Sequence, residues 1–364
     1  MPLTQVDQGL LGQYAQYTGF KNRIINGAMM IDQRNAGAAQ NNLSSGWVYT
    51  VDRWEVYSNN SSRFSTQQNR GSVTPPAGFK NYLGVVVNTG YSVGASDYNI
   101  LAQPIEGFNT ADLGFGASGA SPVNVSFWVY SSVTGTHSGF LGNNTLVTAY
   151  PFTFSVPVAN TWTQISVAIS GSTSGSWIGA TNGIGLFVGF NLGNGSNFQT
   201  ASPNAWNSSA FIQPSTAVSV VSTTGATFYI TGVQLEKGST ATSFDYRPYG
   251  TELALCQRYL PVYVASAANE LICYAQGAST TVFRAIIPFQ VTTRVKSTGI
   301  TVSSTSDFFV NGNVNTTPSA MVWNDGTLNS GAVQITGSGM TAGFSCVLYS
   351  NTSTAKIIFT GCEL

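Results

Sequence analysis

Charged side chains are scarce in this chain and absent from about a third of it. They make up 8% of the 364 residues, about a third of the usual share. No Asp, Glu, Lys or Arg occurs between Leu113 and Leu235. General acid–base catalysis, capture of metal ions by carboxylates and phosphate binding by basic side chains all need such groups. This third of the chain is therefore expected to present a surface rather than to carry out chemistry.

The sequence also lacks an excess of charge of either sign. Its 14 basic and 14 acidic residues balance, which excludes the basic footprint of a nucleic-acid-binding protein. No apolar run reaches the roughly 18 residues of a transmembrane helix. The first residues, Met1 to Gln5, lack the basic and apolar regions of a secretory signal. We therefore expect neither nucleic-acid binding nor membrane insertion.

Cysteine is rare and late. The four cysteines, at positions 256, 273, 346 and 362, form no CxxC pair and have no histidine beside them, which argues against zinc. Cys273 and Cys346 lie in apolar, strand-like segments and are interpreted as small buried hydrophobic residues. The sequence leaves a disulfide and any other bound metal open, and it indicates no cofactor.

What the chain does contain favours β-structure. Its 43% hydrophobic and 12% aromatic content excludes a disordered protein. Val123, Val125, Phe127 and Val129 alternate with polar or aromatic residues, the period of a half-buried strand. Short strands without intervening helices predict a jelly-roll β-sandwich. The expected strands are 24–32, 49–57, 83–87, 123–130, 145–156, 163–169, 184–190 and 227–235.

One short helix is predicted after this sandwich. Thr251 can cap it, Glu252 suits its first turn, and Pro261 ends it. A second, smaller β-sandwich is expected beyond it, with strands at 262–265, 271–275, 282–287, 299–303, 308–310, 332–335, 344–349 and 356–360. The predicted organisation is an attachment segment (1–21), a jelly-roll domain (22–249), a connecting helix (250–263) and a C-terminal tip domain (264–364).

Several segments of the first domain resemble a known family. They are NRIINGAMMIDQR at 22–34, YTVDRW at 49–54, FWVYS at 127–131 and TGVQLEKG at 231–238. FDYRPY at 244–249, which runs into ELALCQRY at 252–259, is the most specific. Over roughly residues 22–260 the chain resembles tail-fibre and receptor-binding proteins of tailed bacteriophages, whose module is similar to carbohydrate-binding jelly rolls.

The resemblance implies a structural protein of the virion, assembled in the host cytoplasm and then extracellular. It implies a homotrimer joined to other virion proteins through residues 1–21, with a C-terminal domain that faces the host. The partner would be a bacterial surface polysaccharide or lipopolysaccharide. Head fibres and capsid decoration proteins share the same module, so a capsid-bound protein is the alternative.

Sugar recognition needs a flat aromatic face with amide or carboxylate groups beside it. Trp323, Asn324 and Asp325 offer these groups together at a predicted loop tip, and Asn311 and Asn313 flank another tip. Trp206 is a loop aromatic of the first domain. For each tryptophan the alternative is a packed side chain that anchors a turn. The other strand-associated tryptophans are expected to lie mostly in the core; they are Trp47, Trp54, Trp128 and Trp162.

No catalytic site is predicted. His137 lies in a turn-like run and is interpreted as a solvated loop residue. Carboxylates for glycoside cleavage would have to come from Asp52, Glu55, Asp97 and Glu106, and nothing in their spacing favours it. A polysaccharide depolymerase is therefore the second alternative. Asp52, Arg53 and Glu55 are interpreted as a strand-end ion-pair cluster, with a calcium or ligand role as the alternative. Arg247 is expected to reach a carboxylate or carbonyl.

Overall fold

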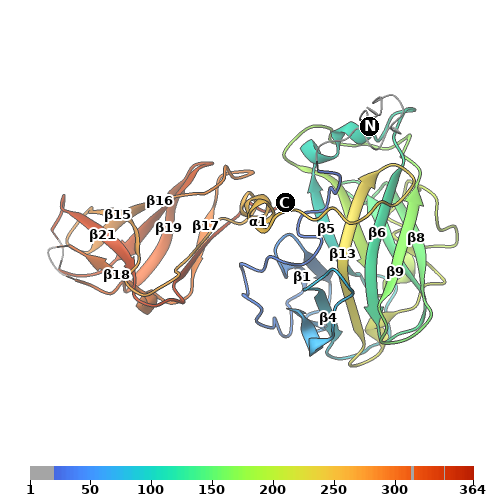
Figure 1. Cartoon of the computed structure of the whole chain (residues 1–364), viewed down its shortest axis with the longest axis horizontal. Coiled ribbons are helices and arrows are strands. Elements are labelled where there is room, and N and C mark those ends of the chain that lie inside the picture. The colour runs from blue at the N-terminus through green and yellow to red at the C-terminus, as the bar shows by residue number, and fades with distance from the viewer. Residues whose placement is uncertain (1–19, 313–314, 340) are drawn as a thin grey trace, which may run out of the picture. The chain divides into compact units, whose positions relative to one another are not determined.

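The computed structural model describes residues 20–312, 315–339 and 341–364. The chain forms two compact units that divide between Pro248 and Tyr249, and strands dominate both (Figure 1). The predicted all-β class is confirmed: a jelly-roll β-sandwich is followed by a second, smaller one. The expected attachment segment, residues 1–21, lies outside the described residues except for Phe20 and Lys21.

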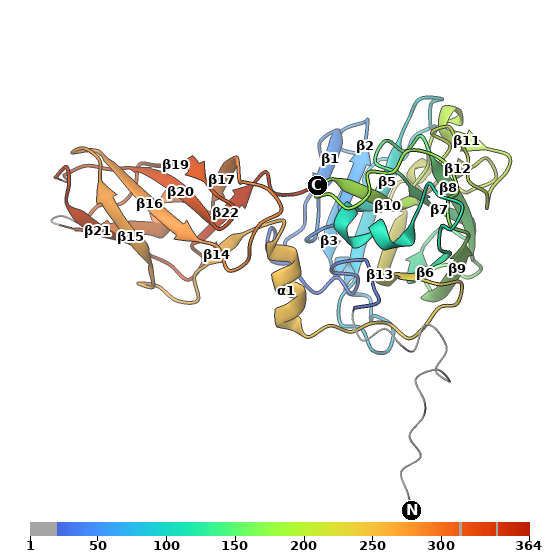
Figure 2. The ribbon, with the colours of Figure 1, turned by 90° about the horizontal axis from the view of Figure 1, so that it is seen from above.

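The first unit consists of two antiparallel sheets that face each other. The five-stranded sheet has the order β3 (Phe64–Gln68), β4 (Leu83–Val87), β13 (Thr227–Lys237), β6 (Val123–Ser131) and β9 (Thr163–Ile169). The six-stranded sheet has the order β1 (Gly46–Tyr49), β2 (Glu55–Ser58), β5 (Asn99–Glu106), β10 (Ile184–Asn191), β7 (Gly135–Gly142) and β8 (Ala149–Val156). A short parallel pair, β11 (Gln199–Thr200) and β12 (Gln213–Pro214), lies beside β7 and β8 (Figure 2).

The core of this unit follows from alternation along the strands. On β6, Val123, Val125, Phe127 and Val129 are buried, whereas the intervening Ser126, Trp128 and Tyr130 are half-buried on the opposite face. The Phe127 ring meets that of Phe190 from β10 with 4.8 Å between centroids. Residues of both sheets thus form one apolar layer, whose burial is the main stabilising contribution.

Two of the predicted strands are wrong. Residues 24–32 form turns and irregular backbone, and 49–57 is a hairpin in which β1 and β2 are joined by a turn. The 24–32 segment is held by side-chain amides in place of a ladder. The Gln103 amide donates to Ile25 O at 2.8 Å and accepts from Ile25 N at 2.9 Å, and Asn26 bonds both N and O of Ile31.

The two ends of the first unit are fastened together. Asp245 Oδ2 accepts from the backbone N–H groups of Lys21 and Asn22. Arg247 donates to the carbonyls of Ile24, at 3.1 Å, and Asn22. The prediction that Arg247 reaches a carbonyl is therefore confirmed. The family-like segment 244–249 thus holds the family-like segment 22–34 in place. The two segments form one structural feature.

The second unit begins with α1 (Tyr249–Gln257). Thr251 lies inside this helix, so its predicted role as the cap is wrong; the helix begins two residues earlier and ends before Pro261. Single-turn 3-10 helices occur elsewhere in both units: η2 (Arg70–Ser72), η3 (Gly107–Asn109), η4 (Ala111–Leu113), η5 (Ser196–Phe198), η6 (Val220–Ser222) and η7 (Thr305–Asp307).

Two antiparallel sheets enclose the core of the second unit. The three-stranded sheet has the order β14 (Val262–Val264), β22 (Lys356–Thr360) and β17 (Gly299–Val302). The six-stranded sheet has the order β18 (Phe308–Asn311), β21 (Ser345–Ser350), β15 (Leu271–Gly277), β16 (Val282–Pro288), β20 (Ser330–Thr336) and β19 (Ala320–Gly326). Cys273 and Cys346 are buried in this core, as predicted, and all four cysteines are free thiols.

Candidate functional site

The cluster Trp323, Asn324 and Asp325 does not lie at a loop tip, as the sequence predicted. These residues belong to the edge strand β19, whose pairing with β20 continues to Gly326 opposite Gly331. The turn comes later, where Thr327 N donates to Ser330 O at 2.8 Å. Asp325 and Gly326 therefore close the strand.

Most polar groups of this cluster already have partners. Lys296 Nζ lies 2.6 Å from Asp325 Oδ1, and this contact holds the pKa of the Asp325 carboxyl below its usual value. The same ammonium lies 5.8 Å from the centroid of the half-buried Trp323 ring. The exposed Asn324 is the group of this cluster that is open to a ligand. Receptor contact by Trp323, Asn324 and Asp325 stays a prediction.

The remaining predicted residues are spread over both units. Asn311 closes β18 and is exposed, and Asn313 lies outside the described residues. Trp206 lies in a loop of the first unit, half-buried, with ring contacts to Phe115, Tyr150 and Trp177. Its indole Nε1 donates to Ser170 O at 2.7 Å. Trp206 therefore behaves as a packed anchor of the first unit, whereas the other predicted residues belong to the second unit.

A row of aromatic rings on the outer face of the six-stranded sheet of the first unit was missed. Trp47 on β1 contacts Tyr57 on β2, Tyr57 contacts Tyr98, and Tyr98 contacts Phe198, with centroid separations of 5.0, 5.3 and 4.8 Å. The Trp47 side chain is 41% exposed and stacks on Phe187 of β10 at 5.8 Å and 11°. We call the rings of Trp47, Tyr57, Tyr98 and Phe198 the Trp47 row. Its first member is an indole backed by one ring and open to solvent.

Amide and hydroxyl groups border the other end of the Trp47 row. Asn59 accepts from Tyr98 N and donates to Ser96 O at 2.9 Å. Asn197 donates to Ser96 Oγ at 3.0 Å. All three of these polar side chains are exposed, so each retains hydrogen-bonding capacity toward solvent. The arrangement combines a flat apolar face with neutral donors and acceptors.

The four rings of the Trp47 row are uncharged, and one carboxylate, that of Asp97, lies beside them. Burial raises the pKa of Tyr98 far above its ordinary value, so its hydroxyl stays neutral. The neighbouring Asp97 carboxylate accepts from Gly94 N at 2.7 Å and from Asn60 Nδ2 at 3.1 Å. Because this carboxylate is already bonded by donors of the protein, the chemistry of the row suits an uncharged, partly apolar ligand.

A second aromatic group, on the outer face of the five-stranded sheet, is covered by the chain itself. Tyr130 and Tyr229 stack at 5.3 Å and 5°, and Trp162 Nε1 donates to Thr74 O at 2.9 Å. Burial raises the pKa of Tyr229 to about 12. Trp54 is fully buried as expected. Of the four tryptophans expected mostly in the core, Trp54 alone is buried, whereas Trp128 and Trp162 are half-buried and Trp47 is exposed.

His137 is not a solvated loop residue. It lies on β7, is 1% exposed and stacks on Phe154 at 5.7 Å. Its Nε2 donates to Val133 O at 2.8 Å, while burial holds the pKa of the ring below its usual value. The ring is therefore a neutral member of the core. The sequence signal was weak because glycines surround it.

The carboxylates that glycoside cleavage would need are mostly inside the protein. Asp52, Glu55 and Glu106 are at most 3% exposed. Asp52 accepts from Gln33 N and Nε2, and burial raises the pKa of its carboxyl. Arg53, also buried, donates to Pro104 O at 2.5 Å. Within the described part of the chain, no group of three His, Cys, Asp or Glu side chains could hold a metal ion.

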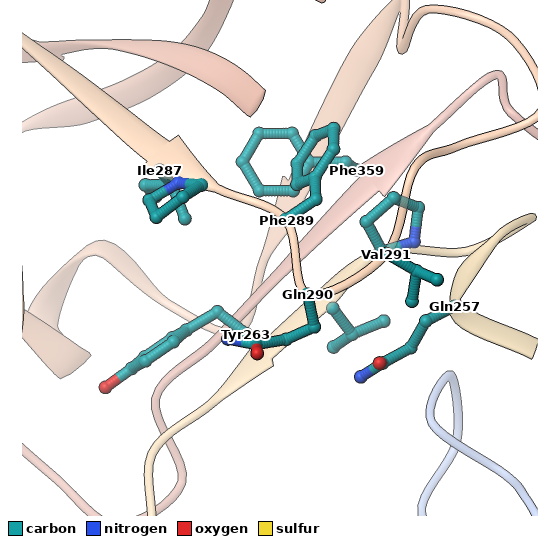
Figure 3. Close-up of a pocket in the computed structure, with 10 residues that line it drawn as sticks. Gln257, Tyr263, Ile287, Phe289, Gln290, Val291 and Phe359 are labelled. Atoms are coloured by element: carbon teal, nitrogen blue, oxygen red, sulfur yellow. The ribbon is translucent and has the colours of Figure 1, made fainter. Parts of the chain in front are cut away.

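One pocket of the second unit is lined by α1, β14, β16, β22 and the segment after β16. Its walls are Gln257, Pro261, Val262, Tyr263, Ile287, Pro288, Phe289, Gln290, Val291 and Phe359. Figure 3 shows the Phe289 and Phe359 rings side by side, with Tyr263 directed away from them. Tyr263 is its one titratable lining group, and burial raises the pKa of that hydroxyl to about 12. The pocket therefore offers no acid–base pair near neutral pH.

The comparisons with known proteins are distant. No family model and no curated protein matches the sequence. Among solved structures, the chain is similar to the enzymatically active domain of tailspike protein 4 of bacteriophage CBA120, at 12% identity and TM-score 0.32, over 59% of this chain and 21% of that one.

It is also similar to the family 11 carbohydrate-binding module of Clostridium thermocellum in complex with a β-1,3-1,4-mixed-linked tetrasaccharide. The identity is 10% and the TM-score 0.28, over 55% of this chain and 99% of that module. At such TM-scores no argument about fold or function rests on either likeness. In the described part of the chain, no helix is long and apolar enough to cross a membrane.

Proposed function

We propose that this chain is a non-enzymatic virion protein of a tailed bacteriophage, a tail fibre that adheres to a bacterial surface glycan. The Trp47 row is its contact for uncharged sugar. The observation that carries the proposal is the indole of Trp47, stacked on Phe187 and 41% exposed. An open aromatic face packs against the C–H face of a pyranose, and the amides of Asn59 and Asn197, at the other end of the row, suit the hydroxyl groups of another sugar of the same glycan.

The phage assignment rests on the family-like segments of the sequence. The first of them, 22–34, and the last, 244–249, are the parts that Asp245 and Arg247 fasten together. In this proposal they close the module that carries the Trp47 row. Residues 1–21 join other virion proteins, and the chain acts as a homotrimer, because several weak sugar sites on one particle raise the effective concentration at a surface.

The test of sugar binding uses the full chain in native gels that contain dextran, galactomannan or mixed-linkage β-glucan. We expect at least one neutral polymer to retard the wild type. Trp47→Ala should weaken the affinity about fivefold to thirtyfold, since stacking on one ring contributes on the order of 1–2 kcal/mol. The matched control is Phe108→Ala, which removes a ring outside the row that is more exposed than Trp47. Free migration of the wild type, or full retention of Trp47→Ala, would overturn the assignment.

Three further measurements test the rest of the proposal. Light scattering should give three times 38.4 kDa, and a monomer would refute the trimer. The bound polysaccharide should release no new reducing ends; release would favour a depolymerase. An antibody against the chain should label the phage tail in electron micrographs, whereas label over the capsid would support the head-fibre alternative.

A further inference from the structure

The outer face of the six-stranded sheet in the second unit is open and carries large side chains. Along β16, Phe283, Ala285 and Ile287 point into the core, so Arg284 and Ile286 point outward. Ile286 is 64% exposed, and Tyr274 on the neighbouring β15 is 73% exposed. These strands lie in the middle of the sheet, so the face lies away from its edges.

Arg284 is the one basic side chain of this unit's described residues without a partner. Arg258 and Arg294 donate to backbone carbonyls, Lys296 pairs with Asp325, and Lys356 has a contact of its own. Among the residues that the structure describes, Arg284 forms no hydrogen bond or ion pair, although its side chain is exposed in the centre of a sheet. A guanidinium held there is available to an anion from solution.

Two glutamines flank Arg284 in register. Gln276 on β15 and Gln334 on β20 both lie directly opposite it. Neighbouring strands are about 4.8 Å apart, so the three side chains span roughly 10 Å. Within the described chain, neither amide bonds to another residue. Each therefore keeps a donor and an acceptor for ligand hydroxyls.

The charge of this face is unopposed. The other strands of the sheet contain no Asp or Glu, apart from Asp325 on the edge strand, which is paired with Lys296. Arg284 is the only Lys or Arg in the six strands. A second copy of the chain, placed face to face about a two-fold axis through the centre of this sheet, would bring two guanidinium groups together. An anionic ligand is the better complement.

We propose that Arg284, Gln276, Gln334 and Tyr274 form a binding site, the Arg284 face, for an acidic glycan of the uronate type. The carboxylate of one sugar pairs with the planar guanidinium through two parallel hydrogen bonds. The amides bind ring hydroxyls, and the exposed Tyr274 ring packs against a pyranose face. This site is distinct from the Trp47 row and does not depend on it.

The experiment measures binding of the full chain to polygalacturonate and to its fully methyl-esterified form, which has the same backbone without the charge. The wild type should bind polygalacturonate and bind the ester at least about tenfold more weakly, because charge-assisted hydrogen bonds are lost. Arg284→Gln should lose a similar factor, and Arg284→Lys should fall between the two. Tyr274→Ala should weaken binding severalfold.

The matched control is Lys80→Gln, which removes one exposed positive charge from the first unit, also without a partner in the described structure. It should bind polygalacturonate as the wild type does. Equal losses in Lys80→Gln and Arg284→Gln would show that net charge alone matters and would overturn the site. So would full retention in Arg284→Gln, equally strong binding of the ester or of inorganic polyphosphate, or dimerisation that Arg284→Gln abolishes.

Discussion

The outer faces of the two six-stranded sheets differ in what covers them. In the first unit, Phe140 and Phe187 lie on the outer face yet are at most 5% exposed, packed with Ile212 from the segment that carries β12. In the second unit, Tyr274 and Ile286 occupy comparable positions and remain mostly exposed. A similar sheet thus carries a second core in one unit and an open surface in the other.

The difference teaches that strand alternation sets which side a residue faces but not whether that side meets water. On β10, and on β7 from His137 onward, residues of both faces are buried or nearly so, and glycine is frequent. Gly189 allows the Phe140 ring to lie against the sheet, since a Cβ there would collide with it. On β16, buried and exposed residues alternate. The exposed side chains that could bind a ligand therefore lie at the rim of the outer face in the first unit. In the second unit they are spread across the outer face.

The largest effect is expected from truncating a covered ring. Phe140→Ala should lower the free energy of unfolding of the first unit by about 3–5 kcal/mol, because the ring is fully buried and a cavity remains. Ile286→Ala, on the open face, should change the second unit by less than about 0.5 kcal/mol. Calorimetry of the full chain, with tryptophan fluorescence reporting mainly the first unit, checks both values. Equal losses of unfolding free energy in the two variants would show that the two outer faces do not differ in this way.

A smaller effect is expected from pH just below neutrality, in the first unit, which holds the chain's one histidine. Burial puts the folded pKa of His137 below its unfolded value of about 6.5. The unfolded chain therefore binds more protons as the pH falls below about 6.5. The free energy of unfolding should drop by at most about 1.4 kcal/mol per pH unit until the folded pKa is passed. His137→Gln should abolish this slope, and an unchanged slope would assign it to another group.

The smallest effect is expected from the exposed ion pair at the edge of the second unit. Lys296 and Asp325 are 51% and 64% exposed. Exposed pairs contribute little because solvent screens them, so Lys296→Met should lower the Tm of this unit only slightly. Its Tm measured at low and high salt should then converge with that of the wild type as salt screens the pair. A larger loss would mean that Lys296 supports Trp323 structurally.

Much of the fold could be predicted from the sequence. Strands β4, β6, β9 and β16 show alternation or compact β-branched runs, and they lie within a residue of the predicted ranges. β5 and β7 were missed for a physical reason. Every residue of β5 is buried, so the period of two disappears, and β7 is rich in glycine.

The irregular 24–32 segment was predicted as a strand for the opposite reason. Its apolar residues are buried like those of a strand, but its backbone partners are side chains such as Gln103, far away in the sequence. The local sequence pattern cannot show whether buried backbone groups are hydrogen-bonded by a neighbouring strand or by side chains.

The candidate sites were less predictable than the fold. The Trp47 indole stacks on Phe187, which lies far away in the sequence, so the local pattern could not reveal this contact. The outward direction of Arg284 can be derived from the VFRAIIP alternation on β16. That it lacks a partner could not be derived, because this depends on the residues that cross-strand pairing places beside it.

The most direct test is a crossed titration of Trp47→Ala and Arg284→Gln, each against the neutral polymer that retards the wild type and against polygalacturonate. If the two outer faces are separate sites, Trp47→Ala loses the neutral polymer and keeps the acidic one, and Arg284→Gln does the reverse. If either variant loses both polymers while remaining folded, or if neither loses its own, the account of two distinct sugar-binding faces is contradicted.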